Sequence, residues 1–250
     1  MSFDQKKSWV LQSLSTTLFW ISSISFLRAL RGVAPVTGWP SVTPLQVLLA
    51  VHGALVFIGA SCWLFLERHN PTHDSCFSRL LPDSSRWTKQ QYCAVHKAKI
   101  EGLDHHCTWL NVSVGRSNYV PFFVLTVCGA LQFTLQVVVC GLMARPTALV
   151  ADGDSATVIF GLWAAGATLA ALLSAYIASN YGTLLLFHLM LARRGISTYD
   201  WLLDRRKKKS NKKAAEAGSS AASKPAAPDA SNQDSSHVAV TAANIAPEVV

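Results

Sequence analysis

The stretch PLQVLLAVHGALVFIGASCWLFL, residues 44–66, decides the fold, because it contains no Asp, Glu, Lys or Arg. A helix of about 20 apolar residues crosses the roughly 30 Å of hydrocarbon in a bilayer. Three further uncharged stretches are long enough to do the same, namely Trp9–Leu27, Val120–Met143 and Ala156–Ala178. The sequence therefore predicts an all-α polytopic membrane protein with four transmembrane helices and a long loop between the second and third helices.

The composition agrees with this prediction. Half of the residues are hydrophobic, 14% are charged, and the mean hydropathy is +0.28. The net charge of +8 would favour a nucleic-acid partner if the basic residues formed a patch on a soluble domain. They lie instead between the apolar spans, so we expect a lipid bilayer as partner and no nucleic acid.

The basic residues also predict the orientation in the membrane. The loop between the second and third spans holds seven Lys and Arg residues, and many more follow Ala192. The two other connections, residues 28–43 and 144–155, hold three together. Since Lys and Arg favour the cytosolic side, we expect the N-terminus, the middle loop and the C-terminus to be cytosolic.

The chain divides into five predicted segments. These are residues 1–66 with the first two helices, the cytosolic loop 67–118, the third and fourth helices in 119–192, a basic juxtamembrane segment 193–209, and a tail 210–250. The tail is rich in Ala, Ser, Pro, Lys, Asp and Asn and has almost no aromatic residue. Such a composition cannot bury enough apolar area to fold, so the tail is predicted to be disordered.

The residues suited to chemistry gather in the middle loop, in the run Asp104-His105-His106-Cys107. Cys107 is the candidate nucleophile, with His105 as its base and Asp104 as the group that orients the histidine. Clustered Cys and His are also common as metal ligands or as surface residues without a role. From these residues alone, all three interpretations stay open.

The window DHHCTWLNVSVGRSNYVPFF, residues 104–123, resembles the signature of the DHHC-type protein S-acyltransferases. That signature reads Asp-His-His-Cys-Pro-Trp, two residues, Asn-Cys-Val-Gly, and then Asn-Tyr and Phe. The residues that match it in register are Asp104, His105, His106, Cys107, Trp109, Asn111, Val114, Gly115, Asn118, Tyr119 and Phe122. A second family element, Thr-Thr-x-Glu, is similar to residues 197–200, Ser-Thr-Tyr-Asp.

The resemblance implies an enzyme that moves a long-chain acyl group from acyl-CoA, such as palmitoyl-CoA, to cysteines of proteins. Cys107 would carry the acyl group, His105 would act as base, and Asp104 would orient it. Thr198 would contact the region of Asp104, while Asn111 and Asn118 would support the motif. The expected partners are membrane-associated proteins with cytosolic cysteines, and the family suggests the Golgi or the endoplasmic reticulum.

The resemblance also implies two zinc sites in the loop, where this sequence departs from the family. The ligand positions of one site hold residues that do not ordinarily bind zinc, Arg79, Pro82, Tyr92 and Lys99. The other site keeps three competent ligands, Cys93, His96 and His106, with Ser113 in fourth place. One partial zinc site and no metal at all are both open, and so is support of the loop by an accessory subunit.

Two other functions compete with the transferase. A catalytically weak or inactive membrane adaptor would use the loop to bind partners. A transporter would need paired ionisable residues within the spans. The four predicted spans contain His52 as their single His, Asp, Glu, Lys or Arg. We therefore rank the transferase first, the adaptor second and the transporter third.

Overall fold

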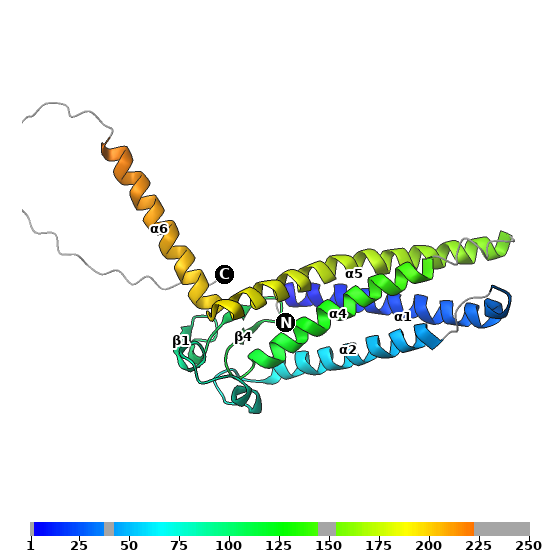
Figure 1. The fold of residues 1–250 in the computed structure, drawn as a ribbon, viewed down its shortest axis with the longest axis horizontal. Helices are drawn as coiled ribbons and strands as arrows, with labels where there is room; N and C mark the ends of the chain where they lie inside the picture. The colour runs from blue at the N-terminus through cyan, green and yellow to red at the C-terminus, as the bar shows by residue number, and fades with distance from the viewer. Residues whose placement is uncertain (1–2, 38–42, 145–153, 223–250) are drawn as a thin grey trace, which may run out of the picture.

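The computed structural model describes residues 3–37, 43–144 and 154–222. Four long helices form an elongated bundle (Figure 1), and they are α1 (Phe3–Thr37), α2 (Thr43–Arg68), α4 (Tyr119–Ala144) and α5 (Asp154–Arg194). Each contains a segment long and apolar enough to cross a membrane, so the prediction of four spans is confirmed. Helix α4 packs against the other three and forms the centre of the bundle.

The fourth helix extends well beyond its most apolar stretch, residues 156–178. The uncharged run continues past Ala178 to Ala192 in the sequence, which is too long for one perpendicular span and predicts a helix that tilts or runs on, and α5 indeed continues to Arg194. The polar side chain of Asn180 does not interrupt the helix, because its amide donates back to the carbonyl of Tyr176 at 3.0 Å. The helix ends at Gly195, whose φ of +66° favours glycine.

A buried polar cluster joins the four helices inside the bundle. The side chain of Gln136 on α4 bonds to Ser15 of α1 at 3.2 Å, to Ser174 of α5 at 2.6 Å and to His52 of α2 at 2.9 Å. Polar groups in an apolar setting must find partners within the protein. Gln136 therefore helps to fix the four helices relative to one another.

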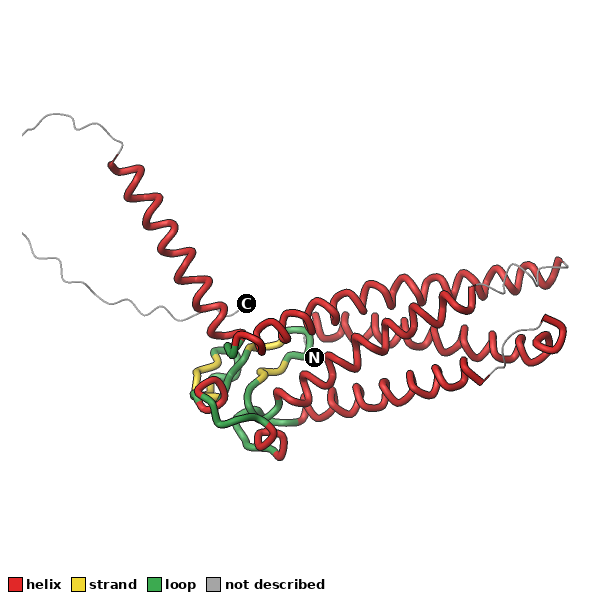
Figure 2. The backbone as a smooth tube through the Cα atoms, viewed as in Figure 1, coloured by secondary structure: helices red, strands yellow, loops and turns green. Residues whose placement is uncertain are grey.

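The predicted loop between α2 and α4 is a small folded unit at one end of the bundle (Figure 2). It contains the short helices η1 (Cys76–Leu80) and α3 (Ser85–Thr88) and four short strands, β1 (Gln90–Cys93), β2 (Ala98–Glu101), β3 (His105–Cys107) and β4 (Val112–Val114). The strands form two antiparallel hairpins, β1 with β2 and β3 with β4. The start of α1 and the start of α6 lie at this same end (Figure 1).

Trp109 attaches the folded loop to the bundle. Its ring packs edge to face against Trp63 of α2 and Tyr181 of α5, with ring centres 5.6 and 5.7 Å apart. A buried apolar cluster beneath it contains Trp63, Leu66 and Cys107. Packing against the bundle thus places β3 at the membrane end of the loop.

Helix α6 (Thr198–Ala222) leaves the bundle at an angle (Figure 1). It passes residue 210, where the sequence predicted the start of a disordered tail. Its Ala, Lys and Glu residues are strong helix formers, so a composition that cannot build a core still extends a helix that has already begun. The rest of that predicted tail, residues 223–250, lies outside the described residues.

We predict that Gln136→Leu destabilises the bundle. The substitution leaves Ser15, Ser174 and His52 without their shared partner, at a cost of about 1–3 kcal/mol. The thermal unfolding midpoint in detergent should fall. The matched control is Gln46→Leu on the exposed face of α2, and equal midpoints for the two variants would contradict the role given to Gln136.

Candidate active site

Cys107 ends strand β3 and is almost fully buried, with 3% of its surface exposed. Strand β3 pairs with β4, and Cys107 lies opposite Val112. The thiol is a member of the apolar cluster that contains Trp63 and Leu66 of α2. The candidate nucleophile is therefore held where the folded loop meets the transmembrane helices.

His105 lies between Cys107 and Asp104. Its Nδ1–H donates to the Oδ2 of Asp104 at 2.9 Å, and its side chain also hydrogen-bonds the thiol of Cys107. The edge of Phe122 packs against the imidazole with ring centres 5.2 Å apart. The structure thus brings together the three residues that the sequence predicted to act in concert.

Asp104 has no exposed surface, and its carboxylate is fully occupied by partners. Besides His105, the backbone N–H of Thr198 donates to Oδ1 at 3.0 Å and the Thr198 hydroxyl donates to Oδ2 at 2.7 Å. The guanidinium of Arg86 lies 3.5 Å from Oδ1. These donors and charges offset the cost of burying a carboxylate.

The charges of the pair follow from these contacts. Burial alone would raise the pKa of Asp104, but hydrogen bonds from His105 and Thr198 outweigh it and lower the pKa to about 2. Burial alone would lower the pKa of His105, but its bonds to Asp104 and Cys107 raise the pKa to about 9. At neutral pH the site therefore holds a carboxylate and an imidazolium.

The sequence between α5 and α6 explains how Thr198 reaches Asp104. Helix α5 ends with the N–H of Gly195 bonded to the carbonyl of Ala192 and that of Ile196 bonded to Leu191, at 3.1 and 3.3 Å. Ser197 then caps α6, because its hydroxyl accepts from the N–H of Asp200 at 3.0 Å. The first turn of α6 thus points its free N–H groups and the positive end of its dipole at the Asp104 carboxylate.

The other predicted motif residues shape the chain around β4. The side chain of Asn118 accepts from the N–H of Gly115 at 2.8 Å and donates to the carbonyl of Ser113 at 3.1 Å. A Cβ at Gly115 would lie 2.6 Å from the side chain of Ile100, so glycine is required there. Asn111 adopts φ of +56° in the turn before β4, a conformation that Asn tolerates better than most residues.

Two site residues were missed by the sequence analysis, Arg86 and His188. Arg86 stacks on Trp87 at 4.3 Å, and its guanidinium also approaches Tyr119 and Asp104. His188 of α5 is buried beside His105 and Asp104 and bonds to the hydroxyl of Tyr119 at 3.3 Å. The sequence offers one weak signal for His188, a single imidazole in an apolar run, and none that separates Arg86 from its basic neighbours.

Asp104, His105 and His188 have ligand atoms close enough to share a metal ion, within 4.8 Å of one another. However, Arg86 places a positive charge 3.5 Å from the same carboxylate, which disfavours a second cation. The tentative metal ligands Cys93, His96 and His106 lie elsewhere, around the hydroxyl of Ser113. The geometry next to Cys107 suits proton transfer rather than metal binding.

Comparison with known proteins agrees with this geometry. Residues 76–205 match the sequence profile of the family described as DHHC palmitoyltransferase. Two similar proteins from Arabidopsis thaliana are "Probable protein S-acyltransferase 20", 30% identical over 125 residues, and "Probable protein S-acyltransferase 5", 26% identical over 113 residues. These matches cover 46% and 45% of this chain but 18% and 23% of the relatives. The chain thus matches less than a quarter of the length of these two proteins.

The raised pKa of His105 predicts a pH dependence of stability. Its folded pKa of about 9 exceeds the ordinary value of 6.5, so the stabilisation is complete below pH 6.5 and is lost as the pH rises towards 9. The difference in unfolding free energy between wild type and His105→Gln should shrink over this range. Denaturant unfolding in detergent at several pH values measures it, and His73→Gln, an exposed histidine, is the matched control. A constant difference from pH 6 to 9 would show that folding does not raise the pKa of His105.

Proposed function

Because the chain belongs to the DHHC palmitoyltransferase family, we propose that it is a protein S-acyltransferase that forms an acyl-Cys107 intermediate. It takes a long-chain acyl group, such as palmitoyl, from acyl-CoA and passes it to cysteine thiols of membrane-associated proteins. The observation that carries the proposal is the unbroken series of contacts from Thr198 through Asp104 and His105 to Cys107.

In the first half of the reaction Cys107 reacts as a thiolate beside the imidazolium of His105, whose charge Asp104 stabilises. The thiolate attacks the carbonyl carbon of the acyl-CoA thioester, a new C–S bond forms, and the bond to the CoA sulfur breaks. CoA leaves as a thiol after taking the proton from His105. The imidazolium of His105 thus stabilises the attacking thiolate and then protonates the leaving CoA sulfur.

In the second half the same groups act in the opposite sense. Neutral His105 accepts the proton of the substrate cysteine, whose thiolate attacks the acyl-Cys107 thioester. The acyl group moves to the substrate protein, and Cys107 leaves as a thiolate beside the imidazolium. The carboxylate of Asp104 holds the Nδ1–H of His105 throughout, which keeps the other ring nitrogen directed at sulfur.

The transmembrane bundle offers space for the acyl chain. A cavity of about 450 Å³ lies between α1, α2, α4 and α5, within the roughly 300–1,000 Å³ typical of small-molecule sites. Trp63 lines this cavity and also belongs to the apolar cluster that contains Cys107. An acyl chain gains about 0.8 kcal/mol for each CH₂ that it buries, so an apolar space that begins near the nucleophile favours long-chain donors.

The proposed orientation places the N-terminus, the folded loop and the C-terminus in the cytosol. It rests on the excess of Lys and Arg in the loop and after Ala192, and α1 and α6 begin at the end of the bundle that carries the loop. Acyl-CoA and the substrate cysteines would then reach Cys107 from the cytosol. The family-level location is the Golgi or the endoplasmic reticulum, and an accessory subunit would act on the loop from the same side.

We predict that purified protein incubated with a clickable palmitoyl-CoA analogue becomes labelled through a thioester that hydroxylamine releases. Cys107→Ala should abolish the label, because it removes the thiol that His105 contacts. The matched control is Cys76→Ala, an exposed loop cysteine, which should label like wild type. Equal labelling of folded wild type and Cys107→Ala, or no labelling of either, would remove the transferase function and favour an adaptor.

A further inference from the structure

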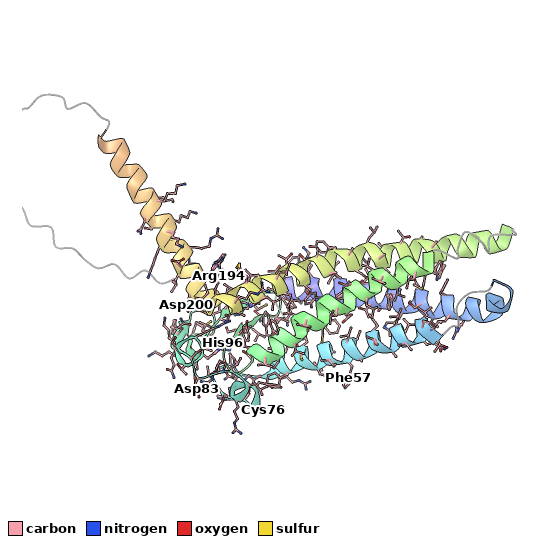
Figure 3. All side chains as sticks on the ribbon, in the orientation of Figure 1. Phe57, Cys76, Asp83, His96, Arg194 and Asp200 are labelled. Carbon is pink, nitrogen blue, oxygen red and sulfur yellow. The ribbon has the colours of Figure 1, made fainter. Side chains whose placement is uncertain are left out.

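The family implies structural zinc in the loop, where this chain keeps three competent ligand residues. Cys93 ends strand β1, His96 lies in the turn before β2 (Figure 3), and His106 lies in β3. In a tetrahedral zinc site the bonds are about 2.0–2.3 Å, so any two ligand atoms lie within roughly 4 Å of each other. Within the described part of the chain, the three residues whose ligand atoms all lie within 4.8 Å of one another are Asp104, His105 and His188. Cys93, His96 and His106 do not form such a group. The arrangement of Cys93, His96 and His106 therefore does not fit a zinc ion.

A serine hydroxyl is the common partner of all three side chains. The Oγ of Ser113 lies 3.0 Å from the Nδ1 of His106, 3.3 Å from the Nδ1 of His96 and 3.2 Å from the Sγ of Cys93. A hydroxyl offers one donor and two acceptor positions, and three partners use all of them. Ser113 has no exposed surface, so this complete set of bonds also satisfies a polar group that water cannot reach.

The contacts of Ser113 connect the two hairpins of the loop. Ser113 lies opposite His106 in the pairing of β3 with β4, so that bond stays within one hairpin. Its contacts with Cys93 and His96 cross to the hairpin of β1 and β2. Because β3 carries His105 and Cys107, the position of the reactive hairpin depends on this point of attachment.

The surroundings strengthen the same attachment. Cys93 packs with Ile100 and Leu103 in a small buried cluster, and Tyr199 of α6 covers it. Elsewhere in the loop, Arg116 pairs with Asp83 and with Glu101, the latter at 2.9 Å. The guanidinium also donates to the carbonyl of Ser78 at 3.4 Å. Side-chain contacts of the chain itself thus join separate parts of the loop.

We propose that the Ser113 hydroxyl takes the place of a structural zinc ion and joins the two hairpins through hydrogen bonds, so that the loop folds without metal. Ser113 stands where a thiolate would complete the ligand set, and it supplies a small hydroxyl that the three remaining side chains can bond. Ser113→Cys restores a Cys₂His₂ ligand set. It should convert the hydrogen-bonded site into a zinc site.

The test is the zinc content of the full chain purified in detergent with zinc in the growth medium, measured by plasma mass spectrometry. Wild type should contain well under 0.1 zinc per chain, and its thermal midpoint should not change in a strong chelator. Ser113→Cys should contain about one zinc per chain and should become sensitive to the chelator. Ser85→Cys, which adds a thiol at an exposed loop position, is the matched control and should remain free of zinc.

About one zinc per wild-type chain that is lost in Cys93→Ala would overturn the proposal. A folded Ser113→Cys protein that takes up no zinc would also overturn it, because Ser113 would then not occupy a ligand position. Ser113→Ala and Ser113→Thr give a second readout in case the cysteine variant does not fold. Thermal midpoints close to wild type for Thr and clearly lower for Ala support the hydroxyl as the connection, whereas equal midpoints contradict it. None of these readouts depends on transferase activity.

Discussion

The buried carboxylate of Asp104 is the interaction on which the rest of the site depends. A carboxylate without exposed surface is tolerated only where donors and charges surround it. Here the donors come from three distant segments, since Thr198 begins α6, Arg86 belongs to α3 and His105 belongs to β3. The loop, the end of the fourth span and the reactive strand must therefore come together before Asp104 can stay charged, and the position of Cys107 beside His105 follows from that closure.

The site also depends on its place between two environments. The transmembrane helices supply the apolar side, where Trp109 docks between Trp63 and Tyr181. The folded loop supplies the polar side, where Ser113 joins the two hairpins. A thioester with a long apolar chain and a large charged head needs both environments at once, and β3 runs along their border. Burial opposes both charges, and the hydrogen bonds and charges that Asp104, His105, Thr198 and Cys107 exchange outweigh it, which accounts for the direction of both pKa shifts.

The features that could be predicted from the sequence are those that leave a signal in a short window. Four uncharged stretches predicted the four spans, and the run around Cys107 predicted a reactive loop. The approach of Thr198 to Asp104 was expected from family resemblance alone, because no pattern links residues so far apart in the chain. Arg86 and the bonds of Ser113 depend on tertiary contacts, and nothing in the sequence distinguishes this arginine or this serine from their neighbours. The helical stretch of α6 beyond residue 210 was not predicted, because a composition too polar to build a core can still extend a helix that has already begun.

The most direct test of this account is the rate at which Cys107 is acylated in Asp104→Asn, followed by rapid mixing with palmitoyl-CoA and detection of released CoA. Asparagine keeps the shape but removes the charge that holds His105 protonated, so acylation should slow by about 10²–10⁴-fold while the protein remains folded. Asp204→Asn, an exposed residue of α6, should react like wild type. Acylation of Asp104→Asn at the wild-type rate would contradict the central role of the buried carboxylate.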